Sequence, residues 1–281
     1  MSAYTQNIGT LSRRNLLTGS AALLASGAMG GSLGAYAAVA PAGAEAPAAP
    51  PLPWKYVNLD PLEAGRRAYR NYFDKGGCGS ATYLALVSML REQVGYPWTT
   101  LPDMMMIHAA SGYGGHGTLC GALGGTACVI NLVAYSDEDD TYRQMIDQLF
   151  HWYSNQKFPT TKFDDISSIP NQVQVKAWSP LCHTSVSKWT LEAGEEVTSK
   201  AKKERCAKVS GEVVFVATRA LNDYLDGNWE PTVGEPSDDI AHCIKCHGPS
   251  DVFHDKVGMN QQQGHMECFL CHDDHTVRGR R

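Results

Sequence analysis

The sequence predicts a mainly α-helical protein with a helical N-terminal domain, residues 60–226, and an irregular C-terminal segment, residues 227–281. Apolar residues recur at steps of three and four through most of residues 60–226, which is the period of an amphipathic helix. No stretch of comparable length alternates with the period of two that marks a strand. From Gly227 onward the chain is rich in Gly, Pro, Gln and His, and this composition indicates a segment without its own core.

The first helix is expected to begin after Asp60. Asp60 suits the N-cap, Pro61 suits the first helical position, and Glu63 places an acid in the first turn. The helix fades toward Gly76 and Gly77, where glycine favours a chain reversal.

Three further helices follow in the domain. One starts near Cys78, and its expected buried residues are Tyr83, Leu84, Val87, Leu90 and Val94. The next carries the clearest amphipathic stripe of the chain, which comprises Tyr142, Met145, Ile146, Leu149, Phe150 and Tyr153. A long helix is expected over residues 197–225, with the apolar positions Cys206, Val209, Val213, Val216 and Leu221.

The N-terminus has the features of an export signal. Arg13 and Arg14 open a weakly hydrophobic run of small residues, and Ala42-Gly43-Ala44 provides a small-residue cleavage site. A membrane anchor is the alternative, but repeated Gly and Ala make the run too weakly hydrophobic for one. We therefore predict that residues 1–44 are a twin-arginine signal peptide, that residues 45–59 are a proline-rich lead-in, and that the mature chain lies in the periplasm without a membrane span.

Two Cys-x-x-Cys-His motifs lie in the C-terminal segment, and each is typical of c-type haem attachment. In such a site two thiols bond to the vinyl groups of one porphyrin, and the histidine ligates the iron. Two haems c per chain are therefore predicted, attached at Cys243, Cys246, Cys268 and Cys271, with His247 and His272 as proximal ligands. A four-cysteine zinc ribbon is the alternative, but it explains neither histidine.

The distal haem ligands are less determined by the sequence. His254 and His265 are the first choices, because they lie in a connector with enough glycine and glutamine to wrap around a porphyrin edge. His116 is the rival from the helical domain, because the glycines around it would let a flat macrocycle approach the backbone. Weaker candidates are His108, His151, His183, His242, His275 and the methionines Met104, Met105 and Met106.

A second set of cysteines lies in the helical domain: Cys78, Cys120, Cys182 and Cys206. A cysteine opening a helix, a later Cys-Gly-Ala-Leu-Gly and two further cysteines resemble the redox-active family known by its C-GCAxxG-C-C pattern. Together with the two haem motifs, the chain over residues 60–272 resembles split-Soret cytochrome c. One departure is Gly79, which stands where the family pattern has alanine.

This resemblance implies a homodimer with two c haems per chain, packed face against face, in which one subunit supplies a sixth haem ligand to the other. It also implies that Cys78, Cys120, Cys182 and Cys206 hold a small iron–sulfur cluster of the 2Fe-2S type. Two disulfides are the alternative, because the periplasm is oxidising, and free thiols or zinc remain open.

The export route favours the cluster over the disulfides. Twin-arginine translocation carries folded proteins, so a domain that must fold around a cofactor in the cytoplasm would need it. Cys128 is expected to be a small buried hydrophobe, with the alternative of a substitute cluster ligand eight residues after Cys120.

Two histidines on each iron would leave no open coordination position, so we expect one-electron transfer rather than catalysis. A haem enzyme that reduces a small nitrogen or oxygen species at a five-coordinate haem, or a redox sensor, are the alternatives. Without residues 1–44 the chain has 22 Lys and Arg against 29 Asp and Glu, a formal charge of −7. This charge disfavours nucleic acid as a partner and favours a redox partner with a basic docking surface.

Overall fold

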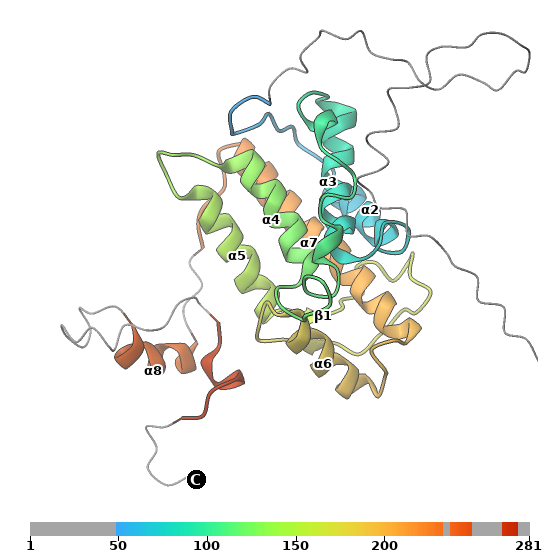
Figure 1. The fold of residues 1–281 in the computed structure, drawn as a ribbon, viewed down its shortest axis with the longest axis vertical. Helices are drawn as coiled ribbons and strands as arrows, with labels where there is room; N and C mark the ends of the chain where they lie inside the picture. Colours follow the sequence, from blue (N-terminus) through green and yellow to red (C-terminus); the bar gives the residue numbers. More distant parts are fainter. Residues whose placement is uncertain (1–48, 233–236, 249–265, 275–281) are drawn as a thin grey trace, which may run out of the picture. The chain divides into compact units, whose positions relative to one another are not determined.

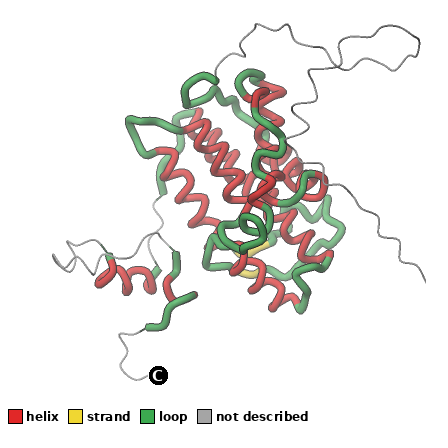
Figure 2. Tube along the Cα trace, in the orientation of Figure 1, coloured by secondary structure: helices red, strands yellow, loops and turns green. Residues whose placement is uncertain are grey.

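The computed structural model describes residues 49–232, 237–248 and 266–274, and the described part of the chain is mainly α-helical, as predicted (Figure 1). The helices of the domain are α2 (Pro61–Asp74), α3 (Cys78–Gln93), α4 (Gly121–Ala134), α5 (Thr141–Asn155), α6 (Cys182–Ala193) and α7 (Lys200–Leu225), with 3-10 turns η2 (Trp98–Thr100) and η3 (Ile107–Ala109). Two short strands, β1 (Lys157–Phe158) and β2 (Val175–Lys176), pair antiparallel and are small beside the helices (Figure 2). The predicted signal peptide lies outside the described residues.

Helix α2 begins as its sequence predicts. The Asp60 side chain accepts hydrogen bonds from the backbone N–H of Leu62 at 2.8 Å and of Glu63 at 3.2 Å. These bonds satisfy two donors that have no partner within the helix, so they fix where α2 starts.

The core lies where α7 packs against α2, α3 and α4, with α3 also in contact with α2 and α4. The apolar periodicity of α3 is confirmed, because four of its five expected residues are buried and Val94 is half-buried. The stripe of α5 is confirmed as well, since Met145, Leu149 and Tyr153 are buried against the core. The helices α4 and α6, which the sequence did not mark as separate helices, begin directly after Cys120 and at Cys182.

The second half of the lead-in belongs to the helical domain. Trp54 packs edge-on against Trp98, with ring centroids 5.2 Å apart, and its backbone N–H donates to Leu132 O at 2.8 Å. Leu59 is only 3% exposed. The domain therefore begins before residue 60, because Trp54 and Tyr56, both ahead of α2, bury their rings in it.

Within its described residues, the C-terminal segment forms the regular helix α8 (Asp238–His247), where the sequence predicted irregular structure. The Ser237 hydroxyl accepts from the backbone N–H of Ile240, and Asp238 and Asp239 lie in the first turn beside the positive end of the helix dipole. A capped start thus overrides the loop-like composition around it. The 3-10 turn η4 (Cys268–Leu270) carries the second haem motif.

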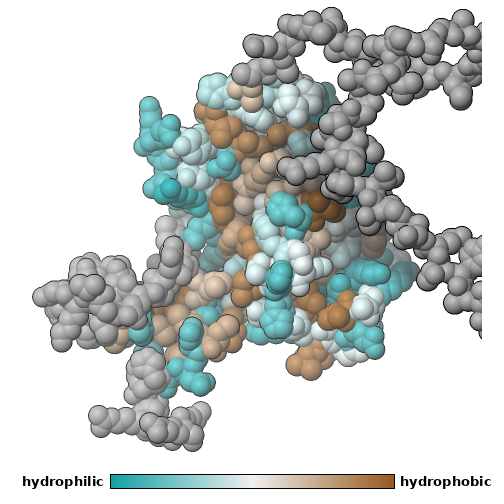
Figure 3. Space-filling model, in the orientation of Figure 1, coloured by the Kyte–Doolittle hydropathy of each residue, from teal (hydrophilic) through white to brown (hydrophobic). Residues whose placement is uncertain are grey.

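No helix in the described ranges is long and apolar enough to cross a membrane. Apolar side chains nevertheless gather over α3 and α4 on the face viewed in Figure 3. Met104, Met105 and Ile107 are among the large apolar residues that remain more than 40% exposed.

Candidate functional site

Three of the four cysteines that the family pattern marks in the domain stand at helix N-termini. Cys78 is the first residue of α3, Cys120 is the residue before α4, and Cys182 is the first residue of α6. Cys206 lies near the start of α7. Because the N-terminus of a helix carries a partial positive charge, these starts favour negative charge on the sulfurs.

A short antiparallel contact brings the starts of α4 and α6 together. The backbone N–H of Cys120 donates to Pro180 O at 2.9 Å, and that of Cys182 donates to Thr118 O at 2.7 Å. Cys120 and Cys182, which are 62 residues apart in the sequence, therefore begin their helices side by side.

The four thiols form one group, which we call the cysteine group: Cys78, Cys120, Cys182 and Cys206. A hydrogen bond joins Cys78 to Cys120, and it raises the pKa of Cys78 while it lowers the pKa of Cys120 to about 6. Cys206 and Cys182 lie close enough to raise the pKa of Cys78 further. Burial, reinforced by the neighbouring thiolates, raises the pKa of Cys182 to about 12.

The residue after Cys120 has to be small. A Cβ atom at Gly121 would lie 2.6 Å from the Cys78 sulfur and 2.3 Å from Ala109 O. Glycine at this position therefore allows the first turn of α4 to approach both Cys78 and the η3 segment.

The departure from the family pattern at Gly79 has a local cause. A Cβ atom at Gly79 would lie 2.6 Å from the Cβ of Ala109 and 2.6 Å from Met106 O. The η3 segment thus packs directly on the backbone of α3 and occupies the space that the family's alanine would need.

Arg205 is a buried cation beside the cysteine group. Its side chain is 1% exposed, its Nη2 donates to Ser185 Oγ at 2.6 Å and Ser185 O at 3.3 Å, and its Nη1 lies 3.8 Å from Cys206 Sγ. It forms no ion pair with a carboxylate of the described residues, and its Nε has no hydrogen-bond acceptor. A buried charge needs compensation. Thiolates at Cys206 and Cys120 interact with the guanidinium, and the buried carboxylate of Glu212 also interacts with it electrostatically, without forming an ion pair.

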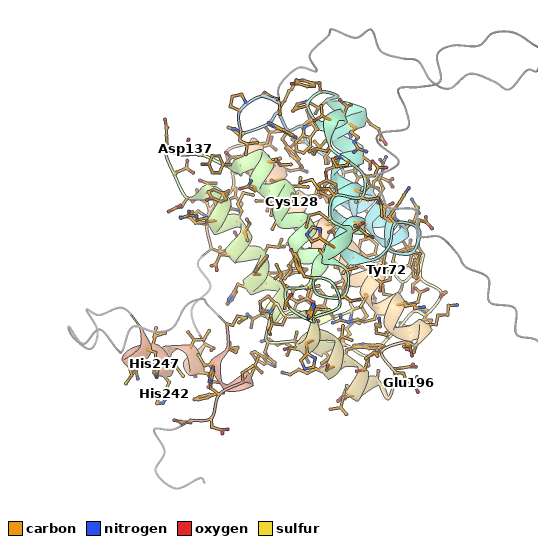
Figure 4. All side chains as sticks on the ribbon, viewed as in Figure 1. Tyr72, Cys128, Asp137, Glu196, His242 and His247 are labelled. Carbon is orange, nitrogen blue, oxygen red and sulfur yellow. The ribbon has the colours of Figure 1, made fainter. Side chains whose placement is uncertain are left out.

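Two tyrosine hydroxyls also contact the cysteine group. Tyr153 hydrogen-bonds to Cys120 and to Ser185, and Tyr72 hydrogen-bonds to Cys206. Burial raises the pKa of both tyrosines, so both remain neutral and can donate to a thiolate. Tyr72, labelled in Figure 4, reaches Cys206 from α2. The sequence pattern reveals neither the contacts of Arg205 and Ser185 nor those of the two tyrosines.

The donor set is chemically selective. Four thiols favour soft metals, above all zinc or an iron–sulfur cluster. No group of three or more His, Cys, Asp or Glu side chains in the described ranges is arranged to hold a metal ion. A binuclear cluster, however, separates its terminal thiolates by two irons and two sulfides, so it does not require the tighter grouping of a single ion.

Cys128 stands apart from the cysteine group. It is half-buried on α4, where eight residues of helix place it about 12 Å along the axis from Cys120. Burial alone raises its pKa. Figure 4 shows it midway along α4, consistent with the predicted role of a small packing residue. None of the nine cysteines, each within the described ranges, is joined in a disulfide.

Each haem motif forms a helical turn. On α8, steps of three and four residues place Cys243, Cys246 and His247 on one face, and none of them is fully buried. In the second motif the backbone N–H groups of Cys271 and His272 donate to Cys268 O at 3.1 and 3.0 Å. Both motifs can therefore present two thiols and an imidazole to the same side.

The two haem motifs are also neighbours. The thiols of Cys243 and Cys268 hydrogen-bond, and burial with this contact raises the pKa of Cys268 to about 11. The ring of His242, on the first motif's helix, lies tilted by 40° against that of Phe269 in the second motif, with ring centroids 6.3 Å apart. His242 and His247 are labelled on α8 in Figure 4.

Of the histidines predicted as distal haem ligands, the structure describes some and not others. His254 and His265 lie outside the described residues, as does His275. His116 is exposed on the loop that leads into Cys120, and the next residue, Gly117, accepts from the backbone N–H of His183 at 2.9 Å. His116 therefore stands at the edge of the cysteine group.

Comparison with known proteins gives three matches. Residues 83–220 match the family of redox-active proteins described by the pattern C_GCAxxG_C_C. Over 277 residues the chain is 33% identical to split-Soret cytochrome c of Desulfovibrio desulfuricans, covering 95% of each chain. A solved structure described as a novel iron centre in that cytochrome superposes with a TM-score of 0.70 at 30% identity, covering 79% of this chain and 90% of the other.

Proposed function

The chain belongs to the split-Soret cytochrome c family, a family of haem c proteins that transfer electrons, and we propose that it carries one electron at a time between two haems c and a 2Fe-2S cluster. The cluster would be held by the cysteine group. The haems would be attached at the Cys-x-x-Cys-His motifs that end in His247 and His272.

The buried charge of Arg205 is the observation that carries the cluster proposal. Two disulfides are uncharged and would leave this buried guanidinium with no anion at its hydrogen-bonding nitrogens, since Glu212 interacts with it without forming an ion pair. Four thiolates on a ferric 2Fe-2S core keep a net negative charge, which Arg205 and three helix N-termini would balance. The charge of the site therefore favours the cluster over the disulfides.

The protein's own residues hold and tune the centres. Bound in the cysteine group, the cluster would supply a one-electron couple. Cys78, Cys120 and Cys182 take their positions from helix starts, so their Cα atoms are fixed by packing rather than by flexible loops. A second histidine on each haem iron, with His254, His265 and His116 as first candidates, would close the iron to substrates and favour electron transfer over catalysis.

We propose that the protein acts in the periplasm as a homodimer. The twin-arginine sequence at Arg13 and Arg14 supports export of a folded, cluster-bearing domain to the periplasm. We infer that two chains associate as a homodimer. The acidic mature chain would favour a redox partner with a basic surface.

Low-temperature EPR with iron analysis tests this function. Protein purified without oxygen should show low-spin ferric haem as isolated, and about two non-haem irons per chain. Dithionite should then produce a rhombic cluster signal. The signal should be lost in Cys120→Ser and kept in Cys128→Ser, the matched control on the same helix.

The opposite result is equally specific. High-spin ferric haem, no non-haem iron and two disulfides in the cysteine group by mass spectrometry would reject the cluster. A haem that binds small nitrogen or oxygen species would then become the better explanation.

A further inference from the structure

A buried line of hydrogen bonds connects Arg205 to Cys120. Arg205 Nη2 donates to Ser185 Oγ at 2.6 Å, Ser185 Oγ lies 2.8 Å from the Tyr153 hydroxyl, and that hydroxyl hydrogen-bonds to Cys120. Arg205, Ser185 and Tyr153 are each at most 1% exposed. Solvent therefore does not screen any hydrogen bond of this line.

The donor order along the line follows from chemistry. A guanidinium can only donate, so Ser185 Oγ accepts from Arg205. In the structure the Tyr153 hydroxyl donates to Ser185 Oγ. With a thiolate at Cys120, the Tyr153 proton turns to the sulfur and the Ser185 proton turns to the Tyr153 oxygen. Each bond polarises the next in the same direction, which carries the effect of the positive charge to the thiolate.

Arg205 acts on a second sulfur directly. Its Nη1 lies 3.8 Å from Cys206 Sγ, and the Tyr72 hydroxyl contacts the same sulfur from α2. Two of the four thiols thus receive hydrogen bonds tied to one cation, and Tyr153 is the residue through which Arg205 reaches the more distant of the two.

We propose that Tyr153 is a positioning residue that raises the reduction potential of the centre in the cysteine group by linking Arg205, through Ser185, to the sulfur of Cys120. This inference rests on the proposed function, because it requires an iron–sulfur cluster at that site. Reduction adds one negative charge, and a donor on a ligand sulfur stabilises that charge, so the hydroxyl favours the reduced state.

The hydroxyl can be removed without disturbing the packing of Tyr153. Its ring contacts Phe158 with centroids 5.0 Å apart, and Tyr153 lies wholly in the core. Phenylalanine keeps these contacts and deletes only the donor. Tyr56→Phe is a matched control, because Tyr56 is also buried, donates to Asn222 Oδ1 at 2.8 Å, and has no hydrogen bond to a cysteine of the described residues.

The test is a redox titration of the full holoprotein followed by EPR of the cluster. At one fixed solution potential, Tyr153→Phe should lower the ratio of reduced to oxidised cluster about tenfold, which is 59 mV for a one-electron couple. Tyr56→Phe should leave the ratio at the wild-type value. The haem potentials, recorded in the same titration, should not change in either variant.

The outcomes separate this inference from the proposed function. If wild-type protein contains no non-haem iron, the proposed function fails and this inference with it. If Tyr153→Phe keeps its non-haem iron and its wild-type ratio, the tuning role is wrong and the function stands.

A second variant tests the inference if Tyr153→Phe loses its iron–sulfur cluster. If Tyr153→Phe does not retain iron, Ser185→Ala breaks the line one step farther from the sulfur and should lower the ratio less, in the same direction. An unchanged ratio in Ser185→Ala would overturn the inference.

Discussion

A Cβ atom on Gly121 would lie 2.6 Å from the sulfur of Cys78. The two residues come from different helices, and their approach is what allows Cys78 to meet Cys120. Such a distance is far below van der Waals contact, so any larger residue at position 121 must displace either α3 or α4.

Gly121→Ala should therefore disrupt the cysteine group. We expect a loss of about 1–3 kcal/mol in the free energy of unfolding from overpacking, together with loss of most non-haem iron. Thermal unfolding and iron analysis measure the two effects. Gly95→Ala is the control: Gly95 has a positive φ, so the variant is strained, but nothing lies within 4 Å of its added methyl, and it should keep its iron.

Restoring the family's alanine at Gly79 should be harmful in this chain. Its methyl would meet Ala109 Cβ at 2.6 Å, so Gly79→Ala alone should destabilise the domain by about 1–3 kcal/mol. Adding Ala109→Gly should recover part of this loss, because it removes one of the two clashing partners. A double-mutant cycle by denaturant unfolding measures the coupling, and additive effects would show that the η3 segment does not cause the departure.

Glu212 should make stability depend on pH. It is 2% exposed on α7, its Oε1 accepts from the backbone N–H of Thr160 at 2.8 Å, and burial raises its pKa from 4.5 to about 7. Between these two values the folded state holds a proton that the unfolded state has lost. The free energy of unfolding therefore falls as pH rises through this window, and above it the full cost of the buried charge remains.

Glu212→Gln should remove this dependence. Glutamine can still accept from Thr160 and carries no charge, so the variant should exceed the wild type in stability above pH 7 by up to about 3 kcal/mol. The two proteins should converge below pH 4.5. Urea unfolding at several pH values gives the comparison, with the exposed Glu192→Gln as control. A constant difference across the pH range would contradict the assignment.

Removal of one haem-attaching thiol should change the haem count. Cys246 stands on α8 one step before His247, and without its sulfur the first motif can form only one thioether bond. Cys246→Ala should weaken or abolish attachment of that haem, so that the pyridine haemochrome absorbance per chain falls toward half. Cys128→Ala, which lies outside both motifs, should keep two haems per chain by the same assay and by mass spectrometry.

The sequence predicted those features that depend on local pattern. The Asp60 cap and the apolar faces of α3 and α5 follow from residue spacing, and the structure confirms them. Helix α8 was missed because its flanking composition resembles a loop, although Ser237, two acids in the first turn and Lys245 in the last turn are a helix signature.

The residues around the cysteine group were harder to predict for a physical reason. Arg205 stands in a run of charged residues at the start of α7, where an arginine normally faces solvent. Its burial depends on α6, which supplies Ser185, and on α5, which supplies Tyr153. Contacts among three separate helices leave no trace in local spacing, and only the packed structure shows them.

The four cysteines lie in or directly before four different helices, α3, α4, α6 and α7, and the last of them follows the first by 128 residues. No single hairpin or fragment of the domain can therefore gather the full ligand set, and metal would meet a complete site only after the whole helical domain has packed. Binding of metal at such a site stabilises the folded state alone, because the unfolded chain has no complete site. A metal-loaded domain is therefore a fully folded domain. A chain that leaves the ribosome in order completes this site late, when α7 docks against α2, α3 and α4.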